Sequence, residues 1–235
     1  MEHKKIVAIV LAAGAGKRMQ SNIPKQFLMM QDKPVLYYSL KAFEESNVDE
    51  IILVIGKDDI EYCRDNIVKK YKFKKVTNII EGGIERYHSV YNGLNSITCA
   101  DYVLIHDGAR PFITMDMIER TIKDVREYDA CVVGVPSKDT VKIVNEVGIV
   151  MDTPDRDKVW SVQTPQAFSY NLIKQAYDLL YNSERENLKI TDDAMVVEHT
   201  LNKPVKLVMG EYSNIKITTP DDLIIGEGIL RKKWF

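Results

Sequence analysis

Short apolar stretches alternate with longer amphipathic stretches through the first half of the chain, and this alternation constrains the fold more than any other feature. The apolar stretches, rich in Val and Ile, predict strands at residues 5–12, 50–55, 75–80, 101–106 and 130–135. The stretches between them predict helices at residues 35–46, 59–71, 85–97 and 115–128. Strands separated by single helices pair in parallel, with helices on both faces of the sheet. The sequence therefore predicts an α/β fold with a Rossmann-like, mainly parallel sheet flanked by helices.

The alternation stops after Pro136, where the chain becomes more polar. Two short alternating runs, TVKIV and IVMDT, flank Asn145-Glu146-Val147-Gly148, and this arrangement is typical of a β-hairpin. A two-stranded hairpin alone is marginally stable in water, so it needs a surface to lie against. We therefore expect residues 136–157 to form a projecting β-hairpin arm that contacts a second copy of the chain. The alternative is a mobile surface flap.

The rest of the sequence predicts three more helices and one clear strand. The helices are expected at residues 170–181, from Thr191 onward and near the C-terminus, and the strand at residues 203–210. Thr219-Pro220-Asp221-Asp222 is a well-formed helix start, with threonine as the N-cap and acids in the first turn. No internal repeat or low-complexity segment is visible, so residues 1–235 are expected to form a single domain with the arm as an insertion.

The charge and cysteine content exclude several classes of protein. A formal net charge of −2 argues against bulk electrostatic binding to nucleic acid or to a membrane. No apolar stretch is long enough to span a bilayer, and the N-terminus runs directly into the first expected strand, without room for a signal peptide. The cysteines Cys63, Cys99 and Cys131 are scattered and odd in number, as expected of free thiols in a reducing compartment. These features predict a soluble cytoplasmic protein.

A turn of small residues follows the first expected strand, in the segment LAAGAGKRMQSNIPKQF, residues 11–27. A dinucleotide fingerprint would need a third glycine where Met19 stands, and a P-loop would need glycine at Leu11 and serine or threonine at Arg18. The small side chains still allow backbone N–H groups to approach and bind an anion. Three cations lie in the same segment: Lys17, Arg18 and Lys25. The residues alone leave open an anion-binding loop or a tight turn with a solvated basic loop behind it.

A second loop, EGGIERYHS at residues 81–89, follows the third expected strand. Ligands of parallel sheets bind outside the carboxyl ends of the strands, so this loop is expected at the same edge as the first one. Its paired glycines would let the main chain approach a flat ligand such as a nucleobase, with Arg86 and Ser89 adding contacts. The alternative is a plain turn between a strand and a helix.

A third loop, LIHDGARPF at residues 104–112, places Asp107 at the end of the fourth expected strand. A carboxylate at this edge can bind Mg²⁺, which keeps most of its waters and takes only one or two protein carboxylates. The alternatives for Asp107 are an ion pair with Arg110 or capping of the next helix. His106 is interpreted as a structural neighbour rather than a catalytic base.

Seven segments in order, across nearly the whole chain, resemble one enzyme family. They are LAAGAGKRM…PKQF, GGIERYHSV, HDGARPF, VPSKDTVK, DRDKVWSVQTPQAF, ITDDA and NIKITTPDDL. Together they are similar to the cytidylyltransferases that act on 2-C-methyl-D-erythritol 4-phosphate, in the non-mevalonate route to isoprenoids. The resemblance implies a nucleotidyltransferase-type fold and the transfer of CMP from CTP to the polyol phosphate, giving CDP-methylerythritol and pyrophosphate. It also implies Mg²⁺ and a homodimer whose β-arms embrace.

The resemblance assigns roles on the nucleotide side of the site by matching positions. Arg18 and Lys25 correspond to the catalytic cations that neutralise the triphosphate in the transition state. The positions that correspond to nucleotide-binding residues are Ala12, Ala13, Gly14, Gly83, Ser89 and Lys216. Asp107 corresponds to the residue at the metal. From the residues alone, Lys216 alternates with its apolar neighbours and would be read as a solvated lysine.

The resemblance also assigns the acceptor side of the site. Thr191 would contact methylerythritol phosphate, and so would Thr140 and Arg156 from the partner's arm. From the residues alone, Thr191 is a good helix N-cap and Arg156 could belong to a surface turn. Two positions depart from the family pattern. Lys17 stands where an arginine is often found, and Ser213 stands where some relatives carry an acid, which bears on any second protein ligand for the metal.

The residue types suit this reaction. A phosphate monoester is mostly dianionic near neutral pH and needs no general base, so the lack of a histidine-centred constellation is expected. The obstacle is repulsion between polyanions, because two unit charges 4 Å apart repel by roughly 4 kcal/mol at an effective dielectric of about 20. Cations and backbone N–H groups that hold the two phosphates in line would lower this barrier.

Three other functions fit parts of the sequence. Ribitol 5-phosphate cytidylyltransferases share the fold and chemistry, but tend to have Gly-Gly where this chain has Ala12-Ala13 and to lack a tryptophan at Trp160. A nicotinamide-dependent oxidoreductase is disfavoured by Met19 and by the lack of an acid at the end of the second expected strand. A non-catalytic nucleotide sensor needs only the first loop to bind its ligand. It would have no need for Asp107 and Lys216 in addition to the cations Arg18 and Lys25.

Overall fold

The computed structural model describes residues 3–14, 16–19, 21, 23–182 and 189–232, with the backbone alone at Lys17 and Lys232. Ala15 in the small-residue turn and the side chain of Lys17 therefore lie outside the described residues. No helix within these ranges is long and apolar enough to cross a membrane.

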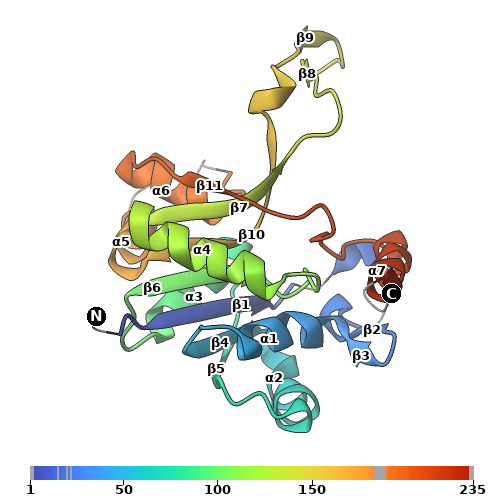
Figure 1. Cartoon of the computed structure of the whole chain (residues 1–235), viewed down its shortest axis with the longest axis vertical. Coiled ribbons are helices and arrows are strands. Elements are labelled where there is room, and N and C mark those ends of the chain that lie inside the picture. The colour runs from blue at the N-terminus through green and yellow to red at the C-terminus, as the bar shows by residue number, and fades with distance from the viewer. Residues whose placement is uncertain (1–2, 15, 20, 22, 183–188, 233–235) are drawn as a thin grey trace.

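A seven-stranded sheet forms the centre of the molecule, in the order β11-β7-β10-β6-β1-β4-β5 (Figure 1). Its strands are β1 (Ile6–Ala12), β4 (Glu50–Ile55), β5 (Val76–Glu81), β6 (Tyr102–Asp107), β7 (Ala130–Pro136), β10 (Trp160–Ser169) and β11 (Lys206–Met209). Strand β10 runs antiparallel to both of its neighbours, whereas the other strand pairs of the sheet are parallel. The prediction of a mainly parallel sheet is confirmed.

Helices cover both faces of the sheet (Figure 1). They are α1 (Val35–Glu45), α2 (Ile60–Cys63) with the π-helical turn η4 (Arg64–Lys69), α3 (Arg86–Ser96), α4 (Met115–Tyr128), α5 (Tyr170–Asn182), α6 (Asp193–Leu201) and α7 (Pro220–Lys232). Helices α1, α2 and α4 pack on one face, and α3, α5 and α6 on the other. The short elements are the 3₁₀ turns η1 (Lys17–Met19), η2 (Lys25–Phe27), η3 (Lys57–Asp59) and η5 (Arg156–Lys158), and the strands β2 (Met29–Met30) and β3 (Lys33–Pro34).

Strand β1 shows why the sheet is buried on both sides. Its side chains alternate between the faces, so Ile6 and Val10 join the core under α1 while Val7 and Ile9 join the core under α3. All four are essentially inaccessible to solvent. A strand that is apolar at every position is typical of a parallel sheet covered by helices on both faces.

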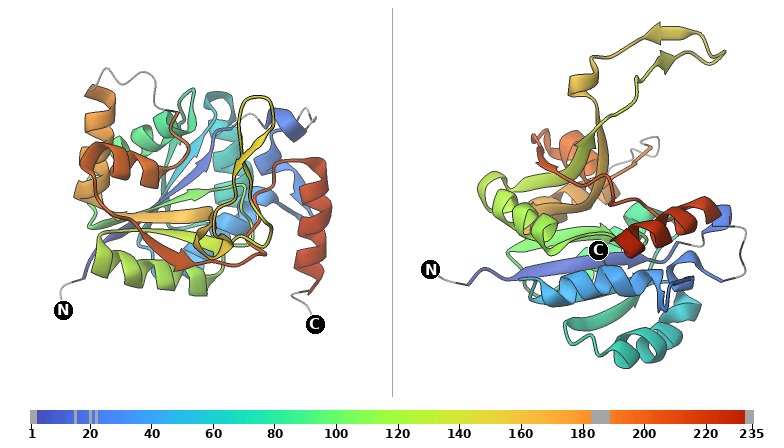
Figure 2. Two further views of the ribbon diagram at one scale, coloured as in Figure 1. Left: turned by 90° about the horizontal axis from the view of Figure 1, so that it is seen from above. Right: turned by 45° about the vertical axis from the view of Figure 1, so that its right-hand side comes forward.

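Helix α7 packs outside the sheet, against the loop that follows β1. A third apolar cluster joins Leu230 of α7 to Met19 and Met30, and Figure 2 shows α7 beside that N-terminal loop. The helix begins at Pro220 as predicted, and the Asp222 carboxylate accepts hydrogen bonds from the backbone N–H groups of Thr218 and Thr219. This packing holds the segment before α7 close to the small-residue turn.

Residues 136–157 leave the sheet and carry the hairpin of β8 (Ile143–Val144) and β9 (Val150–Asp152), which projects away from the other elements (Figures 1 and 2). The Asn145 side chain accepts hydrogen bonds from the N–H groups of Val147 and Ile149 and so closes the hairpin turn. Apolar side chains on the hairpin face solvent, with Val147 78% and Met151 67% exposed. The predicted hairpin is confirmed, and its apolar side chains are left exposed by the part of the chain that the structure describes.

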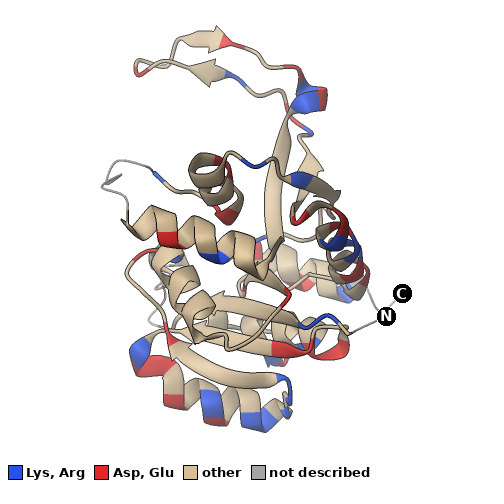
Figure 3. Cartoon of the chain, turned by 90° about the vertical axis from the view of Figure 1, so that its left-hand side faces the viewer, with Lys and Arg blue, Asp and Glu red and all other residues tan. Residues whose placement is uncertain are grey.

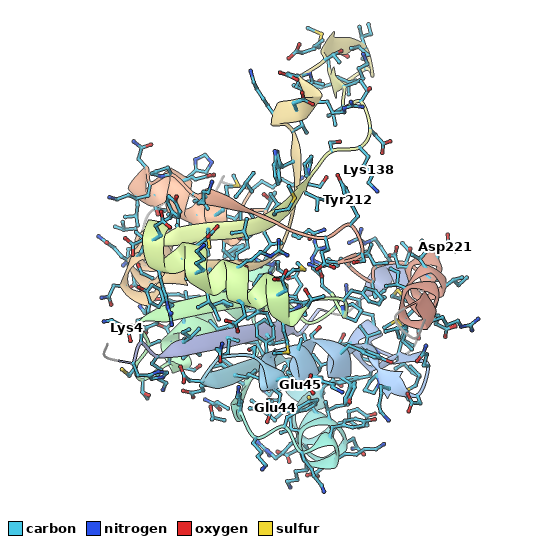
Figure 4. All side chains as sticks on the ribbon, viewed as in Figure 1. Lys4, Glu44, Glu45, Lys138, Tyr212 and Asp221 are labelled. Carbon is cyan, nitrogen blue, oxygen red and sulfur yellow. The ribbon has the colours of Figure 1, made fainter. Side chains whose placement is uncertain are left out.

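The base of the arm is attached to the segment that follows β11. The Tyr212 hydroxyl donates to the carbonyl oxygen of Pro136 at 3.0 Å, and the ammonium of Lys138 lies 3.7 Å from the centre of the Tyr212 ring. Figure 4 shows both side chains where the arm leaves the sheet. These contacts fix the start of the arm to the body of the molecule.

Charges of both signs are mixed over the surface. In the view of Figure 3, positions of Lys and Arg are interspersed with positions of Asp and Glu along the helices. The thiols of Cys63, Cys99 and Cys131 are free, as predicted, and only that of Cys99 is exposed among the three.

Candidate functional site

A cavity of about 290 Å³ opens at the carboxyl ends of β1, β5 and β6. Its walls come from the turn after β1, the start of η2, the loop after β5, the end of β6 and the segment before α7. The lining residues are Leu11, Ala12, Ala13, Gly14, Lys25, Gln26, Gly83, Ile84, Glu85, Arg86, Ser89, Asp107, Ala109 and Lys216. The three loops that were predicted to share one edge of the sheet therefore meet in one cavity.

Close backbone packing holds the glycine loops together. A Cβ at Gly82 would lie 2.3 Å from the Cβ of Ala13 and 2.9 Å from the hydroxyl of Ser89, so only glycine fits there. The N–H of Gly83 donates to the Ser89 hydroxyl at 3.0 Å. A Cβ at Gly14, by contrast, would meet no atom within 4 Å, because that backbone faces open space. The turn after β1 thus presents bare main chain to the cavity, which suits a ligand that approaches closely.

Lys25 is the cation held most firmly against the small-residue turn. Its Nζ donates to the carbonyl oxygen of Ile217 at 3.1 Å, and its stem packs against Gly16, since a Cβ there would lie 3.3 Å from Cγ of Lys25. Burial and the nearby charge of Lys216 lower the pKa of Lys25 to about 8. The ammonium is therefore mostly protonated at neutral pH, yet poorly compensated by its surroundings, and this environment favours an incoming anion.

Arg18, the second predicted catalytic cation, lies on η1 and is exposed. It is not among the residues that line the cavity. It is close enough for its charge to contribute to the lowered pKa of Lys25. The structure therefore brings Lys25 into the cavity wall and leaves Arg18 in the adjacent loop, facing solvent.

Asp107 lies between two cations at the end of β6. Its Oδ2 is 2.7 Å from the ammonium of Lys216, and its Oδ1 accepts from Nε of Arg86 at 3.2 Å. Burial alone would raise the pKa of Asp107, but the charges of Arg86 and Lys216 hold it well below its usual range. The two alternatives predicted for Asp107 were an ion pair with Arg110 and capping of the next helix. The carboxylate instead forms ion pairs with Arg86 and Lys216. Asp107 is a permanent carboxylate on the cavity wall.

His106 is structural, as predicted. The ring is fully buried and hydrogen-bonded to the Thr164 hydroxyl at 3.0 Å and to the carbonyl oxygen of Arg110 at 3.2 Å. Burial lowers the pKa of His106 to about 4, so the ring is neutral near pH 7. A neutral, enclosed imidazole with both nitrogens engaged holds loops together and is not placed to take a proton from a substrate.

Sequence reasoning missed the partners of Arg86. Its guanidinium makes two hydrogen bonds to the Asp193 carboxylate, at 2.9 and 2.7 Å, in addition to its contact with Asp107. Asp193 is wholly buried at the start of α6. A buried carboxylate needs a charged partner. Asp193, followed by the apolar residues of the first turn of α6, was therefore the sequence signal that a cation lies nearby.

The predicted acceptor-side residues are on other surfaces. Thr140 and Arg156 are exposed on the arm, and Thr191 is exposed just before α6. The prediction that Thr191 caps this helix is wrong. Asp192 is the N-cap, because its carboxylate accepts from the N–H of Met195 at 3.0 Å.

The described residues contain no cluster of three or more His, Cys, Asp or Glu side chains that could enclose a metal ion. Asp107 lines the cavity beside the cations, and Glu85 is the other carboxylate among the described lining residues. Ser213 donates to Glu211 instead of facing a ligand site. A single carboxylate suits an Mg²⁺ ion that is held mainly by water and by phosphate oxygens.

The arrangement can bind a polyanion. The ammonium groups of Lys25 and Lys216 line a small cavity beside the main chain of the glycine loops. The guanidinium of Arg86 and the carboxylates of Asp107 and Glu85 also line it. Phosphoryl transfer requires mainly such positioning and charge stabilisation, with little proton transfer by the protein. The site therefore has the chemistry of a phosphate-binding centre, and no histidine is among the described residues that line it.

Comparisons with known proteins agree with this chemistry. The family model described as IspD, 2-C-methyl-D-erythritol 4-phosphate cytidylyltransferase, matches residues 6–232. A protein of that name from Lachnoclostridium phytofermentans is 57% identical over 229 residues, covering 97% of each chain. One from Clostridium botulinum (strain 657 / Type Ba4) is 52% identical over 226 residues, covering 95% of this chain and 96% of the relative.

Solved structures give the same result. The 4-diphosphocytidyl-2C-methyl-D-erythritol synthase of Anaerococcus prevotii DSM 20548 has a TM-score of 0.85 at 38% identity, covering 97% of this chain and 96% of that one. The 2-C-methyl-D-erythritol 4-phosphate cytidylyltransferase of Francisella tularensis has a TM-score of 0.79 at 31% identity, covering 95% and 99%. The α/β fold predicted from the sequence is thus the fold of these enzymes.

Proposed function

The chain belongs to the 2-C-methyl-D-erythritol 4-phosphate cytidylyltransferase family, and from this premise we propose that it transfers CMP from CTP to 2-C-methyl-D-erythritol 4-phosphate. The products are CDP-methylerythritol and pyrophosphate. The observation that carries the proposal is the convergence of Lys25, Lys216 and Asp107 on one cavity beside a turn of bare main chain. This convergence is what an attack of one phosphate on another requires.

The nucleotide half of the mechanism uses fixed positive charge. The backbone of Ala12, Ala13 and Gly14 would hold the triphosphate, and the loop of Gly83 and Ser89 would hold the cytidine. Lys25 and Arg18 would meet the charge that develops as the bond to pyrophosphate breaks. Because these groups are already in place before the reaction, they can stabilise the transition state without reorganising.

The acceptor phosphate needs no base. Its attacking oxygen carries no proton near neutral pH, so the neutral His106 has no role in proton transfer. Lys216 would orient the acceptor and the triphosphate, since its ammonium is a mobile donor on a flexible stem. Repulsion between the two phosphates is the main barrier, and the cavity offsets it with local cations although the whole chain is slightly acidic.

Mg²⁺ fits the residues present. Asp107 would hold the ion with one carboxylate, and phosphate oxygens and water would complete its ligands. When bound, the ion supplies further neutralisation of the triphosphate. The proposal of Mg²⁺ as cofactor rests on the permanent charge of Asp107 and on its place in the cavity.

We also propose that the active protein is a homodimer that exchanges its arms. The exposed apolar side chains of the hairpin need cover, and the arm carries Thr140 and Arg156, which lie outside the chain's own cavity. In the dimer these two residues would join Thr191 of the partner at the acceptor phosphate. The three free thiols support a reducing compartment, such as the cytoplasm.

The test is a pyrophosphate-release assay with CTP and a panel of polyol phosphates. We expect turnover with CTP and methylerythritol 4-phosphate, strictly dependent on a divalent cation, and slow turnover with ribitol 5-phosphate. Faster reaction with ribitol 5-phosphate would reassign the acceptor. Binding of CTP without any turnover over the panel would point to a nucleotide sensor.

A further inference from the structure

Arg86 joins two parts of the site that come from distant parts of the chain. It is the first residue of α3, directly after the glycine loop, and it lines the cavity. Nε donates to Asp107 at the end of β6, and both Nη groups donate to Asp193 in the first turn of α6. One rigid guanidinium thus fixes the nucleotide-side carboxylate and the acceptor-side helix relative to each other.

The partners of Asp193 show that it is satisfied without the third contact of Arg86. Its carboxylate accepts two hydrogen bonds from Arg86 and one from the Tyr177 hydroxyl at 2.7 Å. Its N–H and that of Ala194 both donate to the side-chain oxygen of Gln166, which fixes the helix start to β10. The hydrogen bond from Nε of Arg86 is therefore not needed to compensate the buried charge of Asp193, and it acts on Asp107 instead.

Asp107 is held at both of its oxygens, but by different kinds of group. Lys216 is a flexible point charge, and under the proposed function it also serves the phosphates. Arg86 is anchored by Asp193 and is not free to follow a ligand. When Lys216 turns to a phosphate, Arg86 is the contact that keeps the Asp107 carboxylate in its orientation.

On the acceptor side, the same anchor sets the position of Thr191. Thr191 lies two residues before Asp193, in the turn that leads into α6, and the cap of that helix is Asp192. Gln166 donates to Asp192 at 3.0 Å and accepts from Asp193, so this turn is held as one piece. Moving Arg86 would move this piece relative to Asp107.

We propose that Arg86 is a positioning residue that couples the nucleotide side of the site to the acceptor side, by orienting Asp107 and by fixing the turn that carries Thr191. The inference rests on the proposed function for the identity of the two ligands. The competing interpretation is that Arg86 only compensates the buried charge of Asp193. The two interpretations differ in what happens when both charges are removed together.

The test compares the double variant Arg86→Met/Asp193→Asn with wild type by thermal unfolding, by calorimetric titration with CTP in the presence and absence of Mg²⁺, and by steady-state kinetics. Removing both charges leaves no unpaired buried carboxylate, so the melting temperature should fall by only about 5 °C. Binding of CTP with Mg²⁺ should still weaken about 10- to 100-fold, the usual effect of losing a group that orients a metal-binding carboxylate. The KM for the polyol phosphate should rise as well.

Tyr177→Phe is the matched control. It removes the other side-chain hydrogen bond to Asp193 and leaves Arg86 in place, so it should lower stability while CTP affinity and both KM values stay at the wild-type level. A folded double variant that binds CTP and Mg²⁺ like wild type would overturn the proposal, because charge compensation alone would then account for Arg86.

Arg86→Lys decides the question if the double variant does not fold. A single ammonium cannot keep both contacts to Asp193 and the contact to Asp107, so CTP binding should weaken to a similar degree. Wild-type affinity and KM values in this variant would overturn the proposal. If wild type binds CTP but forms no product, the proposed function fails, while the calorimetric comparison still decides the role of Arg86.

Discussion

The ammonium of Lys216 lies 2.7 Å from the carboxylate of Asp107, and both side chains line the cavity. The pair links the end of β6 to the segment before α7, and it holds one cation ready beside the place where phosphates would bind. An incoming triphosphate and its metal would compete for both members of the pair. The ion pair is thus a resting arrangement that binding is expected to rearrange.

Asp107→Asn should remove the response of CTP binding to Mg²⁺. The amide has no charge with which to hold the ion, and it no longer repels the triphosphate, so metal-free CTP should bind at least as well as to wild type. Titration calorimetry with and without Mg²⁺ measures both effects. Asp65→Asn, at an exposed position away from the cavity, is the control and should behave like wild type. Retention of the Mg²⁺ effect in Asp107→Asn would exclude Asp107 as the metal ligand.

The pH profile should report the titration of Lys25. Its pKa is about 8, so the ammonium is present below that pH and is lost as the pH rises through it. The value of kcat/KM for CTP should therefore fall above about pH 8, whereas kcat should fall at higher pH because bound phosphates stabilise the ammonium. Arginine keeps its charge throughout this pH range, so kcat/KM of Lys25→Arg should not fall above about pH 8. The same fall of kcat/KM above about pH 8 in wild type and in Lys25→Arg would assign the titration to another group.

Lys25→Ala and Arg18→Ala should each lower kcat by about 10²- to 10³-fold, the usual effect of removing one charge-stabilising donor. The dissociation constant of CTP should change much less, because the backbone loops still hold the nucleotide. Single-turnover kinetics and calorimetry separate the two quantities. Lys57→Ala, an exposed lysine outside the cavity, is the control. Wild-type turnover by either variant would remove that residue from the catalytic group.

Helices and strands could be predicted with their bounds where a regular pattern of apolar residues ended at a clear turn signal in the sequence. Residues 50–55 and 115–128 form β4 and α4 with the predicted bounds. Residues 59–71 were predicted as one helix, but the chain there forms η3, α2 and the π-helical turn η4. Such changes of helical pitch depend on how Ile67 and its neighbours pack in the core. The local periodicity of the sequence does not reveal this packing.

The location of the site could be predicted because topology alone brings the strand ends together. The pairing of Arg86 with Asp193 could not, since these residues are 107 positions apart and share no local pattern. The cap of α6 was misassigned for a related reason. Thr191 and Asp192 are both good N-caps in sequence, and only the packing of the helix start against Gln166 selects between them.

Gly82→Ala and Gly14→Ala should separate packing from ligand contact. An alanine at Gly82 collides with Ala13 and Ser89, so it should cost about 1–3 kcal/mol of stability and also weaken CTP binding. An alanine at Gly14 meets no protein atom, so the melting temperature should stay unchanged while CTP binding weakens. Thermal unfolding and calorimetry on both variants test this. Unaltered CTP affinity in Gly14→Ala would show that the nucleotide does not approach this backbone.

Mixing two impaired variants, at a low concentration of the polyol phosphate, tests whether the arm serves the partner's site. In a mixed dimer of Lys25→Ala and Arg156→Ala, one site carries both defects and the other is intact only if Arg156 acts across the interface. With random exchange, about half of the dimers are mixed, so activity should recover to about a quarter of the wild-type level. Each variant alone should show little activity when the polyol phosphate is kept well below the KM of Arg156→Ala, a variant that should raise this KM but not the KM for CTP. If Arg156 acts within its own chain, no site in the mixture is intact and no activity returns.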